Sequence, residues 1–283
     1  MNREQLKNKV LGSLIGFAIG DAMGATTEFM SQREIYQKYG EVKDIIGGGW
    51  LGLTPGEVTD DTQMMTIVAH ALMYEGDRFT EACCEGFVEW LDSDPKDVGN
   101  TCRTAIWYGR GKTPIEWMRM SKDRQVKSGN LDLGNGAVMR ALFPALMGEK
   151  NVAVIQGRLT HNNAVSDLCI MNYCYAISKA LYEPQCWDGG SVDLELMNPT
   201  GHVKNSVNNA IYWSSKANSF GEAIIGPVNH GGDADTIAAL TGGIAGAYFG
   251  KDHIPTKWVE KLSPVVMGDL EEMADWLMNR IKG

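Results

Sequence analysis

The stretch Ile237-Ala238-Ala239-Leu240-Thr241-Gly242-Gly243-Ile244-Ala245-Gly246-Ala247-Tyr248-Phe249-Gly250 decides the fold. Gly242, Gly246 and Gly250 recur at every fourth position, so in an α-helix they lie along one stripe. A stripe without bulky side chains lets another backbone approach closely. The sequence therefore predicts that this helix is central to the protein.

Two acidic clusters stand where predicted helices begin. Gly231-Gly232-Asp233-Ala234-Asp235-Thr236 leads into the glycine-striped helix, and far upstream Thr59-Asp60-Asp61-Thr62 leads into a second apolar segment. In that segment the apolar residues recur at helical spacing, which places both acids above an apolar face; they are Met64, Ile67, Val68, Ala71 and Leu72.

The doubled acids exceed what helix capping requires. One capping residue per helix start contributes about 1 kcal/mol, and a single Asp, Ser or Thr is enough for it. Carboxylates directed into an interior are costly unless they are paired, hydrogen-bonded or bound to metal. If the two helix starts meet, they form an oxygen-rich site suited to Mg²⁺ or Mn²⁺.

The composition favours one compact all-α domain over residues 1–283. The chain is 44 % apolar and has neither a Pro- or Ser-rich linker nor a series of alternating strand segments. Its net charge of −9 argues against nucleic acid as a partner, because such binding depends on Lys and Arg at phosphates. Six Cys residues without C-x-x-C spacing indicate buried free thiols in a reducing cytosol, with a disulfide framework as the alternative.

The N-terminal apolar run has some features of a signal peptide. It is broken by Gly12, Ser13 and Gly16, and Asp21 precedes the apparent cleavage site. The run is also too short to span a bilayer. We expect a first core helix ending near Gly24 in a cytoplasmic protein without membrane contact.

Other segments allow more than one interpretation. The Gly-rich segment 47–56 could close over a ligand or be only a turn. Gly134-Asn135-Gly136 precedes a predicted helix start, where free N–H groups and the helix dipole favour a phosphate. His161 fits a hydrogen-bonding role better than a catalytic base, and the eight Trp residues are expected to pack rather than bind. Asp60-Asp61 also resembles a terpenoid synthase motif, but Met64 stands where that motif has Asp.

Placed in order, six blocks resemble the ADP-ribosylglycohydrolase family, and most closely its bacterial dinitrogenase reductase-activating glycohydrolase branch. The blocks are Gly12-x-Leu14-x-Gly16-x-Ala18-x-Gly20-Asp21-Ala22-x-Gly24-Ala25-x-x-Glu28-Phe29, Thr59-Asp60-Asp61-Thr62, Asp97-Val98-Gly99-Asn100-Thr101, Gly134-Asn135-Gly136-Ala137-x-Met139-Arg140, Thr160-His161 and Asn229-x-Gly231-Gly232-Asp233-Ala234-Asp235-Thr236-x-Ala238-Ala239. One departure is Thr26, where family members often have Pro, a change expected to loosen the loop around Glu28.

The resemblance implies a compact fold of many packed helices with a dinuclear metal cleft holding two divalent cations, Mg²⁺ or Mn²⁺. It implies the metal ligands Thr59, Asp60, Asp61, Asp233, Asp235 and Thr236. It also implies catalytic roles for Glu28, in proton transfer, and for Asp97, in aligning the ribose or water. The implied ADP-ribose-binding residues are Gly99, Asn100, Gly134, Asn135, Gly136 and His161.

The implied reaction is hydrolysis of the N-glycosidic bond between ADP-ribose and an arginine side chain of a protein. The implied partners are an ADP-ribosylated protein as substrate and ADP-ribose as product, and we expect a monomer. Two alternatives stay open: the same fold acting on serine-ADP-ribose or O-acetyl-ADP-ribose, or a protein that binds ADP-ribose without turnover.

Overall fold

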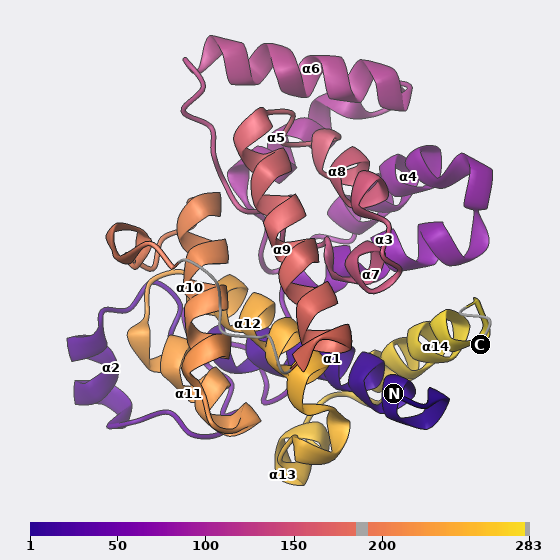
Figure 1. The fold of residues 1–283 in the computed structure, drawn as a ribbon. Helices are drawn as coiled ribbons and strands as arrows, with labels where there is room; N and C mark the ends of the chain where they lie inside the picture. Colours follow the sequence, from indigo (N-terminus) through magenta and orange to yellow (C-terminus); the bar gives the residue numbers. More distant parts are fainter. Residues whose placement is uncertain (185–191, 281–283) are drawn as a thin grey trace.

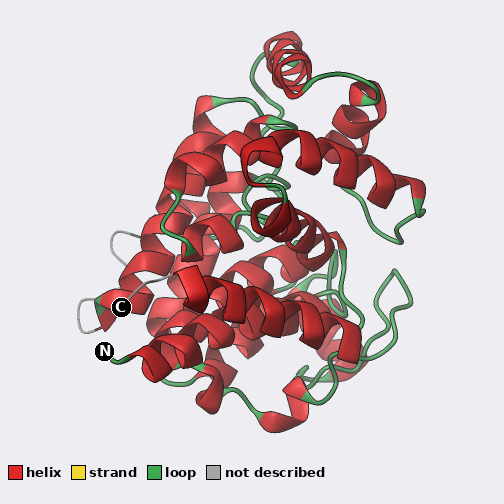
Figure 2. Cartoon of the chain, turned by 90° about the vertical axis from the view of Figure 1, so that its right-hand side faces the viewer, coloured by secondary structure: helices red, strands yellow, loops and turns green. Residues whose placement is uncertain are grey.

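The protein is described by a computed structural model over residues 1–184 and 192–280 (Figure 1). These residues form α-helices joined by loops, and no β-sheet occurs among them (Figure 2). The prediction of an all-α protein is therefore confirmed. The helices are α1 (Arg3–Gly24), α2 (Gln32–Tyr39), α3 (Asp60–Tyr74), α4 (Phe79–Asp92), α5 (Asn100–Gly109), α6 (Pro114–Lys127), α7 (Leu142–Leu146), α8 (Lys150–Arg158), α9 (Ala164–Tyr182), α10 (Val203–Lys216), α11 (Phe220–His230), α12 (Ala234–Phe249), α13 (Thr256–Val259) and α14 (Pro264–Arg280), with short 3₁₀ turns η1 (Gly76–Arg78), η3 (Leu194–Leu196) and η4 (Lys251–His253).

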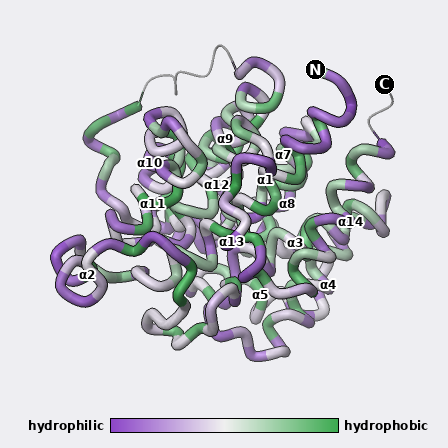
Figure 3. The backbone as a smooth tube through the Cα atoms, turned by 90° about the horizontal axis from the view of Figure 1, so that it is seen from below, coloured by the Kyte–Doolittle hydropathy of each residue, from purple (hydrophilic) through white to green (hydrophobic). Residues whose placement is uncertain are grey.

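Helices α1 and α12 form the centre of the fold and pack against each other along their glycine stripes (Figures 1 and 3). A Cβ atom added at Gly20 would lie 2.0 Å from the carbonyl oxygen of Ala238, and one added at Gly242 would lie 2.0 Å from that of Gly16. The backbones therefore touch where no other side chain fits. The predicted central helix is confirmed, and its close neighbour is the first helix of the chain.

The antiparallel arrangement of this pair positions the polar centre of the protein. Gly24, at the end of α1, lies against Ala234 at the start of α12. Helix α3 begins beside the same point, because Asp21 of α1 accepts hydrogen bonds from Thr59 and Thr62. The two acidic clusters, far apart in sequence, thus meet at one end of the central helix pair.

Two apolar clusters surround this centre, and α3 belongs to both. Met65 and Ala69 pack in the cluster built around α1 and α12, whereas Met64 and Val68 pack with α4 and α5. The sequence predicted a single apolar face on α3, but the helix is buried on two sides. The outlying α2 is largely hydrophilic (Figure 3) and has only Ile35 buried.

Two further expectations concern the cysteines and the N-terminal run. Among the described residues the cysteines are free and buried, as predicted; they are Cys83, Cys84, Cys102, Cys169 and Cys174, and Cys186 lies outside the described residues. The N-terminal run is the buried helix α1, which ends at Gly24. No helix within the described residues is both long and apolar enough to cross a bilayer.

Candidate active site

A cleft of about 380 Å³ opens where the two acidic helix starts meet. Its walls come from the loop after α1, the Gly-rich loop, the starts of α3, α5 and α12, the turn before α7, and the turn between α8 and α9. Of the residues predicted for the site, those that line the cleft are Glu28, Asp60, Asp97, Gly99, Asn100, Gly134, Asn135, Gly136, His161, Asp233, Asp235 and Thr236. Thr59 and Asp61 are buried beside it. The structure therefore brings the predicted residues together.

Asp21 fixes the position of the first acidic cluster. Its fully buried carboxylate accepts hydrogen bonds from the hydroxyl and the N–H of Thr59 at 2.8 and 3.1 Å. It accepts from the hydroxyl and the N–H of Thr62 at 2.5 and 3.1 Å. Burial raises the pKa of Asp21 to about 6, although these hydrogen bonds act in the opposite direction. Asp21 belongs to the first sequence block but was not predicted as a site residue. Its role in positioning Thr59 and Thr62 was therefore missed.

The first cluster directs its own carboxylates toward α12 and α5. Asp61, only 1 % exposed, accepts a hydrogen bond from the hydroxyl of Thr236 at 3.2 Å through Oδ2. Its Oδ1 atom is buried and has no hydrogen-bond partner in the described chain. Asp60 Oδ2 accepts from the N–H of Gly99 at 3.4 Å, which joins the start of α3 to the start of α5.

The second cluster lies opposite the first, together with Glu28. One carboxylate oxygen from each of Glu28, Asp233 and Asp235 falls within 4.8 Å of the other two. Asp233 accepts a hydrogen bond from Asn135 Nδ2 at 2.6 Å, and Glu28 Oε2 accepts from the indole N–H of Trp50 at 2.6 Å. Four separate segments therefore converge on one group of acids.

Burial and mutual repulsion disfavour ionisation of these acids. Burial, together with the Asp97, Asp233 and Asp60 charges, raises the pKa of Glu28 to about 8, although the hydrogen bond from Trp50 acts in the opposite direction. Burial, and then the Asp97 charge, raises the pKa of Asp60 to about 8. The pKa values of Asp61 and Asp235 are raised well above their usual range, first by burial and then by neighbouring carboxylates.

Two further acids of the cleft, Asp233 and Asp97, also have raised pKa values. Burial raises the pKa of Asp233 to about 6, and the hydrogen bond from Asn135 works against that rise. Burial likewise raises the pKa of Asp97. All of these acids therefore lack a positive partner strong enough to offset burial.

This set of donors fits hard divalent cations. Glu28, Asp60, Asp97, Asp233 and Asp235 line the cleft, and no Lys or Arg of the described chain lines it with them. Carboxylates that converge without a counter-charge, beside a buried oxygen that lacks a partner, match the oxygen ligands preferred by Mg²⁺ and Mn²⁺. Glu28, Asp233 and Asp235 already lie close enough together to hold a metal ion.

His161 is placed on the opposite wall by a buried arginine. Arg140 donates from Nη2 to the Thr160 hydroxyl at 2.7 Å, and that hydroxyl lies 2.8 Å from His161 Nδ1. The neutral ring carries a single proton, so one of its two nitrogens donates and the other accepts. Burial lowers the pKa of His161 well below its usual value, helped by the Arg140 and Arg124 charges. His161 Nε2 lies at the cleft wall beside Gly134, where it can form a hydrogen bond with a ligand.

The prediction of a helix starting directly after Gly136 is wrong. Residues 136–140 form turns, and α7 begins only at Leu142. The guanidinium of Arg140 donates to the Gly136 carbonyl at 2.6 Å and so holds the chain in a turn. The N–H of Asn135 is also occupied, because it donates to Gly201 at 3.0 Å. The Gly134–Gly136 wall thus has no helix dipole directed at a phosphate.

Phe29 and Trp50 line the mouth of the cleft and were not predicted as site residues. The tryptophans were expected to pack rather than bind, but Trp50 is 55 % exposed and does not pack in the interior. Its position in the segment 47–56, directly before the first acidic cluster, was the available signal. Thr26 is buried and its hydroxyl donates to the Gly47 carbonyl at 3.1 Å, so in this chain it ties the Gly-rich loop to the end of α1.

Comparison with known proteins agrees with this geometry. The family model described as ADP-ribosylglycohydrolase matches residues 2–283. The chain is 33 % identical to the ADP-ribosyl-[dinitrogen reductase] glycohydrolase of Rhodospirillum rubrum, over 98 % of both chains. It is 27 % identical to the ADP-ribosylarginine hydrolase Tri1 of Pseudomonas putida, over 92 % of this chain and 76 % of the relative. A solved structure described as an ADP-ribosylglycohydrolase-related protein complex has a TM-score of 0.75 and 23 % identity, covering 98 % of this chain and 99 % of its own, and is similar in fold.

Proposed function

This chain belongs to the ADP-ribosylglycohydrolase family, and from that membership we propose that it releases mono-ADP-ribose from arginine side chains by metal-dependent hydrolysis. It is a hydrolase of ADP-ribosylated substrates, as its named relatives are. Arginine as the acceptor is supported by the relative named an ADP-ribosylarginine hydrolase. The terpenoid synthase reading has no support from these relatives.

The observation that carries the metal dependence is the convergence of carboxylates without a counter-cation. We assign the cations to the two helix starts, with the ligands Thr59, Asp60, Asp61, Asp233, Asp235 and Thr236. When bound, divalent cations neutralise these acids, orient a sugar diol and lower the pKa of water in the site.

The remaining groups hold the substrate and move protons. The reaction breaks the bond between the ribose C1″ atom and the guanidine nitrogen, adds the oxygen of water to C1″, and transfers a proton to the departing nitrogen. Glu28 lies at the acid cluster with a pKa raised to about 8 by burial, so it can hold and transfer a proton near neutral pH. We assign to Asp97 the alignment of the ribose or of the attacking water.

The substrate-binding wall follows from the lining residues. Gly99 and Asn100 begin α5 beside Asp97 and would contact the distal ribose. Gly134, Asn135 and Gly136 would follow the path of the ADP-ribose, with His161 Nε2 as a hydrogen-bonding group beside it.

Replacing one acid in each helix start tests this function. Asp60→Asn and Asp235→Asn keep the side-chain volume but remove a charged oxygen, so Mn²⁺ binding measured by calorimetry is expected to weaken. Release of ADP-ribose from an arginine-modified peptide is expected to fall by about a hundredfold or more.

The matched control is Asp275→Asn, which changes an exposed acid paired with Lys7. It is expected to match the wild-type protein in both measurements. Near wild-type turnover in both Asp60→Asn and Asp235→Asn would refute the proposed metal centre.

A further inference from the structure

Two aromatic side chains stand exposed side by side at the mouth of the cleft. Phe29 is 67 % exposed and Trp50 is 55 % exposed, and their ring centroids are 5.5 Å apart with planes inclined at 44°. Both line the acidic cleft, and the indole N–H of Trp50 donates to Glu28. Two exposed rings beside a group of carboxylates form a surface on which a ligand can stack.

Phe29 is held in its position at the expense of backbone strain. Its φ angle is +60°, in the left-handed region that a bulky residue seldom adopts. The Phe29 N–H donates to the Gly232 carbonyl at 2.6 Å, and the Gly232 N–H donates to Met30 at 2.9 Å. These bonds tie the strained residue to the loop that precedes α12. Strain of this kind concentrates at ligand sites.

Trp50 is carried by a glycine-rich turn that is docked on the end of α1. Gly48 and Leu53 exchange backbone hydrogen bonds of 2.7 and 2.9 Å, which close the turn around Trp50. A Cβ atom added at Gly49 would lie 2.2 Å from the carbonyl oxygen of Ala25, so the turn approaches α1 as closely as a glycine allows. Both rings are therefore positioned by backbone contacts.

We propose that Phe29 and Trp50 form the subsite for the guanidinium group of the arginine that carries ADP-ribose, and that they select this acceptor over uncharged ones. This inference rests on the proposed function. A guanidinium plane stacks on aromatic rings and is attracted to their negative faces. The two exposed rings offer such a stacking face directly beside Glu28.

The position of the two rings argues for the acceptor rather than the adenine of ADP-ribose. Phe29 follows Glu28 directly, and Trp50 donates to Glu28, the acid assigned to the breaking bond. A group that stacks on these rings is therefore next to the leaving nitrogen. An adenine stacked there would give a different result, because free ADP-ribose would then depend on the same rings.

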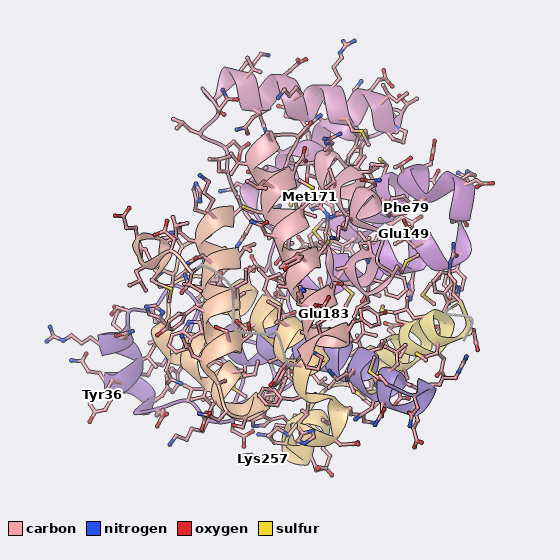
Figure 4. All side chains as sticks on the ribbon, viewed as in Figure 1. Tyr36, Phe79, Glu149, Met171, Glu183 and Lys257 are labelled. Carbon is pink, nitrogen blue, oxygen red and sulfur yellow. The ribbon has the colours of Figure 1, made fainter. Side chains whose placement is uncertain are left out.

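The test compares Phe29→Leu, Trp50→Leu and Trp50→Phe in the full-length chain loaded with Mn²⁺. The readouts are kcat and KM for an ADP-ribosyl-arginine peptide, the same constants for a serine-linked peptide, and calorimetric affinity for free ADP-ribose. Trp50→Phe keeps a ring and loses the hydrogen bond to Glu28, so it separates stacking from that bond. Tyr36→Leu is the control, since Tyr36 is a 76 % exposed aromatic that points outward from α2 (Figure 4).

Phe29→Leu and Trp50→Leu are expected to lower kcat/KM for the arginine substrate by about three- to thirtyfold, mainly through KM. Their affinity for free ADP-ribose is expected to change by less than about twofold. Equal losses for arginine substrate and free ADP-ribose would assign the rings to adenine and overturn the proposal. Unchanged arginine kinetics in both variants would overturn it as well.

A failure of the proposed function gives a separate result. If the wild-type chain hydrolyses neither the arginine-linked nor the serine-linked peptide, the subsite is tested by the binding measurements alone. The proposal then requires the ADP-ribosyl-arginine peptide to bind more tightly than free ADP-ribose, with the difference lost in Phe29→Leu. Equal affinity of the wild-type chain for the two ligands contradicts the subsite. Thermal unfolding of each variant checks that the fold is retained.

Discussion

The buried carboxylates at the acidic centre accept different hydrogen bonds, and their pKa values differ. Asp21 and Asp233 receive short hydrogen bonds from Thr62 and Asn135, and burial raises the pKa of each to about 6. Asp60 has only a long bond from the Gly99 N–H, and its pKa is raised to about 8. Hydrogen bonds to the charged form limit the pKa shift at Asp21 and Asp233, whereas at Glu28 burial and the neighbouring carboxylates outweigh the bond from Trp50.

These pKa shifts predict an unusual pH dependence of stability for the metal-free protein. Asp60 and Glu28 have folded-state pKa values of about 8, compared with about 4 in an unfolded chain. Between those values the folded protein holds more protons, so its free energy of unfolding falls as the pH rises. In EDTA, Tm measured by differential scanning calorimetry is expected to decrease from about pH 5 to about pH 8.

Two comparisons make this prediction specific. Asp60→Asn removes one titrating acid and is expected to give a shallower decrease. Mn²⁺ is expected to raise Tm most at the upper end of the range, where the acids are ionised. A metal-free Tm that rises between about pH 5 and about pH 8 would contradict the assignment.

At the scale of residues, the sequence predicted which side chains lie together at the site, but not which other side chains hold them in place. The acids of both helix starts, Glu28, Asp97 and His161 were expected at one site and lie around one cleft, while their roles stay proposals. The supporting contacts of Asp21 and Arg140 depend on long-range packing that no local pattern reveals. The exposure of Trp50 was not predicted, because tryptophans pack more often than they bind, although its place directly before the first acidic cluster was a signal.

At the scale of elements, the α1–α12 pair depends on direct backbone contact. Gly20→Ala places a methyl group 2.0 Å from the Ala238 carbonyl oxygen, and the helices must separate to admit it. We expect a loss of about 3 kcal/mol or more in the free energy of unfolding, measured by urea denaturation.

The matched control is Gly268→Ala within α14. No heavy atom outside its neighbours lies within 4 Å of the added Cβ at Gly268. Alanine is favoured over glycine in a helix interior by about 0.5–1 kcal/mol, so this variant is expected to be more stable. If Gly20→Ala behaved like Gly268→Ala, the close backbone contact would be ruled out.

Helix boundaries were predictable where capping and periodicity coincide. The starts of α3 and α12 and the end of α1 follow directly from acids, hydroxyls and glycines. The segment after Gly136 was misassigned because the Arg140 side chain satisfies a carbonyl that a helix would have used. Side-chain bonds to the backbone compete with helix formation, and a periodic pattern does not reveal them.

For the whole molecule, α3 links the two apolar clusters and begins at the acidic centre. Because the same helix completes both clusters, neither can be removed without exposing the other. We therefore propose that residues 1–283 fold as a single domain. The family resemblance derived from six sequence blocks is confirmed by the match over residues 2–283, and the all-α fold by the similar solved structure.

For the whole protein, we propose the activity of a metal-dependent ADP-ribosyl-arginine hydrolase. The most direct test is release of ADP-ribose from peptides modified on arginine or on serine, with Mg²⁺, Mn²⁺ or EDTA present. We expect release from the arginine peptide with either metal, none in EDTA, and little from the serine peptide. Release that persists in EDTA, or release from serine alone, would contradict the account.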